Sequence, residues 1–191
     1  MFAISTREDS QNRFAKLTLL ERFLKVPFLL RKIRKAKWYK NEGVSWIPDD
    51  ELQADALSDI ATKANELSVY SVKEDKSDLD WVIAALATTS EHLSNFDYAL
   101  IDTKFLDELN IAYKQTDGTT MDDEVNQSHF DIIELTASKL LQLAYIIKDS
   151  ERDRYSVKKV AQLMVNSIEN ERINRQNLKE DKPDIYRKLK I

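Results

Sequence analysis

The longest regular pattern of apolar and polar residues lies between residues 122 and 148. Its apolar positions recur at alternating steps of three and four, the spacing that places side chains on one face of an α-helix. They are Phe130, Ile133, Ala137, Leu140, Ala144 and Ile147. A second apolar line, which contains Leu135 and Leu143, makes the stripe wider than that of a surface helix. The pattern therefore predicts a nearly buried helix over 122–148, around which the rest of the chain packs.

Shorter amphipathic patterns predict further helices on both sides of this stretch. They cover residues 12–26, 28–40, 49–67, 78–93, 94–110 and 156–173, with a last helical turn at 185–189. Two short segments, 68–72 and 111–115, favour an extended conformation, the first because it alternates serine with valine and tyrosine. We therefore expect a mainly α fold, a single-domain helical bundle around the helix at 122–148 with at most two short extended segments.

Glycine is scarce in the chain, and this strengthens the helical prediction. Gly43 and Gly118 are the two glycines of the sequence, where average usage of about 7% would give roughly thirteen. Phosphate-cradling loops, dinucleotide fingerprints and most tight β-hairpins need glycine where the backbone turns left-handed or approaches a ligand closely. The composition therefore disfavours nucleotide-binding folds of those kinds and favours helices.

The remaining composition fits one soluble domain. The chain has 191 residues and 22.2 kDa, enough to bury a substantial core. Because it contains no cysteine, it can form no disulfide, no thiolate metal site and no cysteine nucleophile. The N-terminal residues lack the apolar run of a secretory signal, and no stretch approaches the roughly 18 apolar residues of a membrane span. We expect a soluble, cytoplasmic protein.

Charge is distributed unevenly between the two ends of the chain. The formal net charge is −4, but residues 1–40 carry +8 and residues 41–191 carry −12. This division predicts a basic amphipathic helical arm over 1–40 and an acidic helical body over 41–191. Such an arm either docks on its own acidic body or meets an anionic partner.

The candidate binding residues of the arm are basic side chains with aromatic neighbours. They are Arg31, Lys32, Arg34, Lys35, Lys37, Trp38 and Lys40. A set of this kind can neutralise phosphates and stack a base in a nucleic-acid complex. The apolar residues of the same predicted helices also suit the groove of a larger protein, a membrane surface or a second copy of the chain. The plainest alternative is that the arm packs on its own domain and leaves its charges in solvent.

A second candidate cluster stands at the start of the predicted central helix. It contains Asp122, Asp123, Glu124 and His129, which could bind a metal ion for hydrolysis if another helix supplied further acids. The structural alternative is stronger, because acids at a helix start interact favourably with the helix dipole. A single histidine among apolar neighbours is also usually a core residue with one hydrogen bond.

The sequence contains no complete catalytic motif. His92 and His129 are its two histidines, and neither H-E-x-x-H, E-x-x-H nor G-x-S-x-G occurs. We therefore expect an accessory or adaptor subunit without enzymatic activity or cofactor, which engages a larger protein partner through the basic N-terminal helices. Nucleic-acid binding by the same arm and metal-assisted hydrolysis at the acidic cluster are the two alternatives.

Overall fold

The computed structural model describes residues 26–38, 47, 48 and 50–190. Most of the helix predicted over 12–26, the predicted boundary between arm and body at residue 40, and Lys40 itself lie outside these residues. Among the described residues, no helix is long and apolar enough to cross a membrane.

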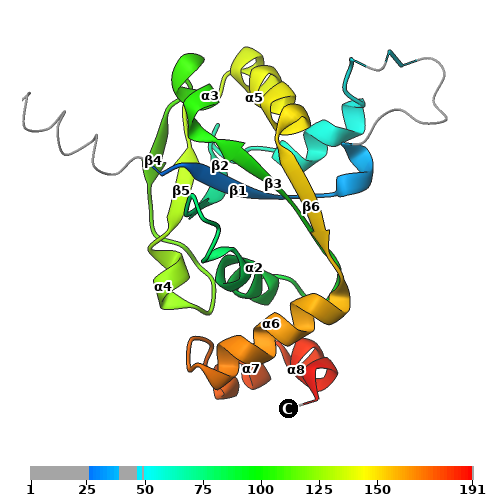
Figure 1. The fold of residues 1–191 in the computed structure, drawn as a ribbon, viewed down its shortest axis with the longest axis vertical. Coiled ribbons are helices and arrows are strands. Elements are labelled where there is room, and N and C mark those ends of the chain that lie inside the picture. The colour runs from blue at the N-terminus through cyan, green and yellow to red at the C-terminus, as the bar shows by residue number, and fades with distance from the viewer. Residues whose placement is uncertain (1–25, 39–46, 49, 191) are drawn as a thin grey trace, which may run out of the picture.

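A six-stranded antiparallel sheet forms the centre of the molecule, with the strand order β4-β5-β2-β1-β3-β6 (Figure 1). The strands are β1 (Phe28–Ile33), β2 (Leu67–Val72), β3 (Phe96–Asp102), β4 (Tyr113–Gln115), β5 (His129–Ile132) and β6 (Glu151–Tyr155). The fold is therefore α/β, and the predicted mainly α, all-helical bundle is wrong. The two segments predicted as extended are confirmed, since 68–72 lies in β2 and 111–115 contains β4.

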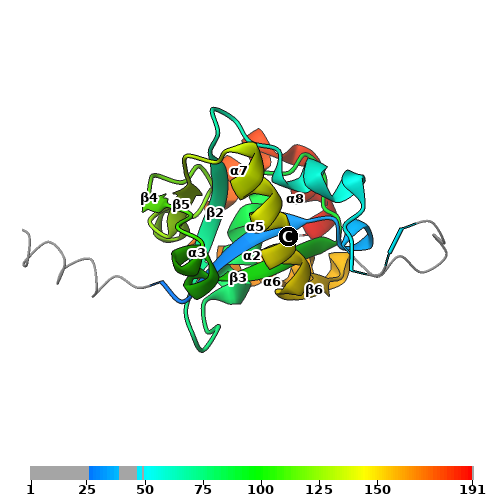
Figure 2. The ribbon, with the colours of Figure 1, turned by 90° about the horizontal axis from the view of Figure 1, so that it is seen from above.

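Helices cover both faces of the sheet (Figures 1 and 2). They are the 3-10 helices η1 (Lys35–Lys37) and η2 (Ala54–Ile60), and the α-helices α2 (Leu79–Thr88), α3 (Thr103–Glu108), α4 (Asp123–Asn126), α5 (Ala137–Asp149), α6 (Val157–Glu169), α7 (Arg175–Asp181) and α8 (Pro183–Leu189). Helices η2, α3 and α5 enclose one core, which includes Leu29 and Leu143. Helices α2, α6, α7 and α8 enclose the other, which includes Leu30 and Met164.

The central strand β1 replaces the helix predicted over 28–40. Leu29 and Ile33 fill one core while Leu30 fills the other, so the strand is buried on both faces. Leu30 lies opposite Tyr70 of β2 and opposite Leu100 of β3, which places β1 between two partner strands. A strand buried on both faces reads as a continuous apolar run, and such a run resembles a buried helix in sequence.

The stretch 122–148 is divided into three elements. Asp122 caps the short helix α4, residues His129–Ile132 form strand β5 between β2 and β4, and Thr136 caps helix α5. The predicted continuous helix is therefore wrong in its first half. In its second half, Leu143 and Ile147 are fully buried on one face of α5, as the periodicity predicts.

Candidate functional site

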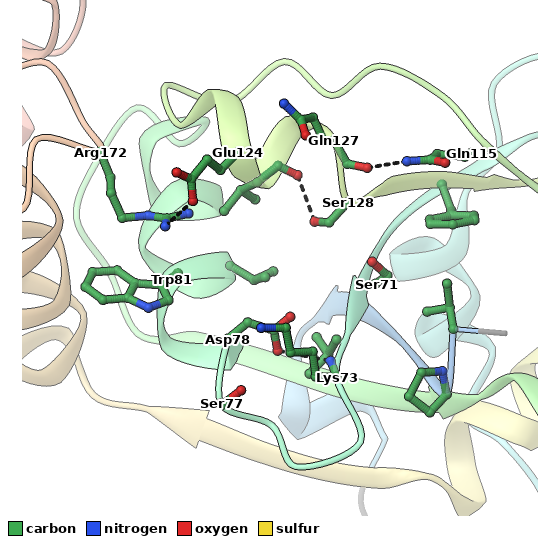
Figure 3. A pocket seen from close by; sticks show the side chains of 16 residues that line it. Ser71, Lys73, Ser77, Asp78, Trp81, Gln115, Glu124, Gln127, Ser128 and Arg172 are labelled. Carbon is green, nitrogen blue, oxygen red and sulfur yellow. Dashed lines mark hydrogen bonds and ion pairs between the residues drawn. The ribbon is translucent and has the colours of Figure 1, made fainter. Parts of the chain in front are cut away.

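An open pocket of about 540 Å³ lies at one end of the sheet, where the chain enters β1 and leaves β2 (Figure 3). Its walls come from the start of β1, the end of β2, the first turn of α2 and helix α4. Trp81 and Arg172 stand on one side of it, and Gln115 and Gln127 on the other. The lining mixes apolar, hydroxyl, amide and charged groups, so the pocket offers room for a small polar ligand.

Arg172 is a polar group of this pocket whose bonding is well defined. Its guanidinium donates from Nε to Asp122 Oδ2 at 2.8 Å, from Nη2 to Asp122 Oδ1 at 3.2 Å and from Nη1 to Glu124 Oε2 at 2.5 Å. It also lies 5.0 Å from the centre of the Trp81 ring. Asp122 Oδ1 accepts the backbone N–H groups of Glu124 and Val125 as well. These groups satisfy one another, so Arg172 joins the C-terminal helices to α4.

The candidate metal ligands are not gathered around one point. Asp122 and Glu124 both face Arg172, Asp123 is exposed on α4, and His129 lies in strand β5. Within the part of the chain that the structure describes, no group of three or more His, Asp or Glu side chains could hold a metal ion. The hypothesis of metal-assisted hydrolysis therefore gains no support from this geometry and stays a prediction.

The aromatic end of the predicted arm is anchored on η2. Trp38 is 2% exposed, and its Nε1 donates to Asp59 Oδ2 at 2.9 Å. The backbone N–H of Arg34 donates to the same oxygen at 2.7 Å. Arg31 donates from Nε and Nη2 to the Asp59 carbonyl at 3.0 and 2.7 Å, and from Nη1 to the Ser68 carbonyl at 2.8 Å. Trp38 is therefore a core residue, and Arg31 crosslinks three segments of the same chain.

Two lysines of the predicted arm also contact the rest of the described chain. Lys32 Nζ donates to Ser90 Oγ at 2.9 Å and lies 5.3 Å from the centre of the Phe96 ring. Lys37 Nζ donates to Ser58 Oγ at 2.6 Å. Lys35 falls within η1. Lys32 and Lys37, like Arg31, thus form hydrogen bonds within their own chain, and the predicted role of the arm toward a partner stays a prediction.

His129 belongs to a hydrogen-bonded chain of polar side chains that the sequence analysis missed. Its Nε2 lies 2.5 Å from Ser68 Oγ, and its Nδ1 lies 2.7 Å from Thr116 Oγ1. Thr116 Oγ1 in turn donates to Asp131 Oδ2 at 2.8 Å. The chain lies along a hollow of about 290 Å³ that Lys63 also lines. Strand register brings these residues together, because Ser68 lies opposite Asp131.

Burial of His129 should make the stability of the protein depend on pH. Burial lowers the pKa of the imidazole below its ordinary 6.5, although the nearby Asp131 carboxylate opposes this shift. The unfolded chain then binds a proton more readily than the folded protein, so stability falls as the pH drops from about 6.5 through the folded pKa. We expect the Tm to fall more between about pH 7.5 and pH 5 in the wild type than in His129→Gln. Equal losses in both proteins would contradict this role for His129.

Exposed apolar side chains gather on α3, on the residue that follows it and on α5. Phe105, Leu109, Leu141 and Tyr145 are between 39% and 49% exposed, and Val157 on α6 is the fifth large apolar residue exposed to this degree in the described chain. Three of the four line a groove of about 290 Å³, and Leu141 precedes Tyr145 by one helical turn. The sequence analysis missed this surface, because it placed Leu141 and Tyr145 in a nearly buried helix and did not single out Phe105 and Leu109 in the helix predicted over 94–110.

Comparison with known proteins identifies no relative from which a function could be transferred. No family model, no curated protein and no solved structure matches the chain. The functional argument therefore rests on the chemistry and geometry of the described residues.

Proposed function

We propose that this protein is an accessory or adaptor subunit that binds an amphipathic helix of a partner protein in the groove between α3 and α5. The observation that carries the proposal is the clustering of Phe105, Leu109, Leu141 and Tyr145 on one surface. Isolated exposed apolar residues are ordinary on a monomer, but a contiguous patch marks a binding surface. A groove between helices with an apolar floor accommodates the apolar face of a partner helix.

The charges around the groove favour a protein partner over a nucleic acid or an anionic membrane. Helices α3 and α5 carry three lysines, Lys104, Lys139 and Lys148, and three acids, Asp107, Glu108 and Asp149. Binding to phosphates or to anionic lipids needs an excess of positive charge. A balanced polar rim around an apolar centre is instead the usual composition of protein interfaces.

The basic N-terminal segment is the other surface proposed for a partner. The contacts of Arg31, Lys32 and Lys37 already use these cations within the described chain, and residues 1–25 lie outside it. Nucleic-acid binding by this segment is the alternative proposal. It predicts affinity that falls steeply with salt concentration. For either function we expect the protein to lie in the cytoplasm.

Site-specific photo-crosslinking at Tyr145 tests the groove. A benzoylphenylalanine at position 145 should crosslink to one protein in a nuclease-treated lysate of the source cells, and mass spectrometry should map the crosslink to a helical segment with apolar residues three or four positions apart. The matched control carries the same group at Val157, which is equally exposed but lies on α6.

Charge substitutions at the same two positions supply the quantitative test. Tyr145→Glu should weaken binding of the mapped partner peptide by at least about tenfold, because it buries an unpaired carboxylate in an apolar interface. Val157→Glu, which adds the same charge at a helix start, should leave binding unchanged. A crosslink to a second copy of this chain, or equal crosslinking at both positions, would refute the proposal.

A further inference from the structure

We propose that Ser68 is a nucleophilic serine, activated by His129, that accepts an acyl group from a small activated ester. Ser68 is exposed and lines the same hollow as His129 and Asp131, so an ester can reach its hydroxyl. The site lies on the opposite face of the sheet from α5. Ser68 and Val69 point to opposite faces of β2, and Val69 belongs to the core that α5 covers.

The hydrogen bonds assign every proton in the chain from Ser68 to Asp131. An ionised carboxylate accepts and does not donate, so the Thr116 hydroxyl gives its proton to Asp131 Oδ2. The same Thr116 oxygen then accepts from Nδ1 of His129, which must carry the ring proton. Nε2 is left with a lone pair 2.5 Å from Ser68 Oγ. This is the arrangement in which a neutral imidazole acts as a general base toward a serine.

The reaction balances without any further reagent. Ser68 Oγ attacks the ester carbonyl while its proton passes to Nε2 of His129. The bond between the carbonyl carbon and the leaving oxygen breaks, and the proton on His129 moves to that oxygen. Asp131 Oδ1 lies 4.0 Å from Nε2, where its charge stabilises the transient imidazolium. The products are acyl-Ser68 and the free alcohol or phenol, with the histidine returned to its neutral form.

Contacts from neighbouring residues fix the positions of Ser68 and His129. Arg31 Nη1 donates to the Ser68 carbonyl, which fixes the backbone that carries the nucleophile. The Tyr70 ring packs edge-on against the imidazole, with ring centres 4.8 Å apart. Tyr70 and His129 are partners in the register of β2 and β5, so the imidazole is positioned by two strands of the sheet. The geometry therefore does not depend on a mobile loop at the nucleophile or at the base.

Acetylation by p-nitrophenyl acetate, followed by intact mass and peptide mapping, tests the proposal on the full chain. We expect one acetyl group on Ser68, none at that position in Ser68→Ala, and a slowing of labelling by about a hundredfold or more in His129→Gln. Ser94→Ala is the matched control, because Ser94 is exposed and its hydroxyl donates to a backbone carbonyl, with no histidine. It should be labelled like the wild type.

Thermal melts of the variants separate loss of chemistry from loss of fold. Ser68→Ala alters an exposed side chain and should keep the wild-type melting transition within a few degrees. Labelling confined to lysines, unchanged labelling in Ser68→Ala, or equal rates in the wild type and a folded His129→Gln would overturn the proposal. Because Ser68 lies on the face of the sheet opposite the α3 and α5 groove, loss of partner binding in Tyr145→Glu leaves this result unaffected.

Discussion

Replacing Asp59 with alanine is expected to lower the free energy of unfolding by about 3 kcal/mol, one of the two largest effects that the structure predicts. The Asp59 carboxylate is buried and accepts hydrogen bonds from Trp38 Nε1 and from the backbone N–H of Arg34. Alanine leaves both donors without this acceptor, and water cannot replace it at Trp38, which is buried. Each buried donor that loses its acceptor costs about 1–3 kcal/mol.

The ion pair between Arg34 and Asp59 contributes little to this effect. Its atoms are 3.9 Å apart and the Arg34 side chain is 75% exposed, so solvent screens the interaction. Asp59→Asn should therefore be much milder than Asp59→Ala, since one amide oxygen can still accept both hydrogen bonds. Asp55→Ala is the matched control, because Asp55 lies on the same 3-10 helix but is exposed.

Urea unfolding of the three variants at one pH distinguishes these contributions. We expect the slope of the free energy of unfolding against urea concentration to be the same in all variants. The free energy of unfolding should fall sharply for Asp59→Ala, fall slightly for Asp59→Asn, and stay within about 0.5 kcal/mol of the wild type for Asp55→Ala. Equal losses in Asp59→Ala and Asp59→Asn would show that charge, and not the two hydrogen bonds, holds η1 against η2.

The contacts of η2 also show how part of the basic segment is bound within the chain. In the segment 31–37, Arg31 and Lys37 donate to the backbone carbonyls of Asp59 and Asp55 in η2, and the backbone N–H of Arg34 donates to the Asp59 carboxylate. The sequence shows that positive charge is concentrated in residues 1–40, but it leaves open whether the basic segment binds its own chain or a partner. In the structure, β1 lies between β2 and β3, and Arg31 and Lys32 form hydrogen bonds within the chain.

Elements that bury one face could be predicted from the sequence, and so could β2, whose serines mark an extended segment, whereas the apolar strands β1 and β3 could not. Helix α6 has one apolar face and Ser156 as its N-cap, and both features are visible in the sequence. In β3, by contrast, Leu100 and Ile101 are neighbours that fill opposite cores. Apolar and polar residues do not alternate along such a strand, so its apolar run resembles that of a buried helix.

The edge strand β6 and the turns could not be predicted for other reasons. Strand β6 is the sequence ERDRY, whose charged residues read as a solvated link, although it pairs along β3. Scarce glycine also misled the prediction, because other residues adopt positive φ in this chain. Asn65, Lys76, Asn110 and Glu134 do so, with φ between 52° and 62°. A low glycine count therefore does not exclude a sheet, although each such residue costs about 1 kcal/mol or more.

The polar chain around His129 could not be found from spacing in the sequence. Ser68 and His129 are 61 positions apart, and they meet because β2 and β5 pair in one particular register. His129 itself was identified as a candidate, but among acids that precede it in the sequence. Its actual partners are a serine and a threonine, and nothing in the one-dimensional pattern distinguishes them from other hydroxyl residues.

Replacing Arg172 with glutamine is expected to lower the free energy of unfolding by about 3 kcal/mol, because it leaves the Asp122 carboxylate buried without its cation. The Asp122 side chain is 2% exposed, and Arg172 contacts both of its oxygens. Glu124 contributes less, since its side chain is 75% exposed and its ion pair is screened by solvent. Arg187→Gln is the control, because Arg187 pairs with Asp184 on the surface and its loss should cost about 0.5 kcal/mol or less.

The double variant Arg172→Gln with Asp122→Asn separates the contribution of the ion pair from the other contacts of the two side chains. If the penalty comes from an unpaired buried charge, removing that charge should restore more than about 1 kcal/mol of the loss, although the new amide side chain must still cap α4. Additive losses in the double variant would contradict the buried ion pair and leave packing of Arg172 on Trp81 as the stabilising contact.

The same variants also test the pocket, because Arg172 lines it together with Trp81 and binds Asp122 at the start of α4. A variant that loses the ion pair should therefore expose Trp81 further to solvent, which tryptophan fluorescence would report as a shift to longer wavelength.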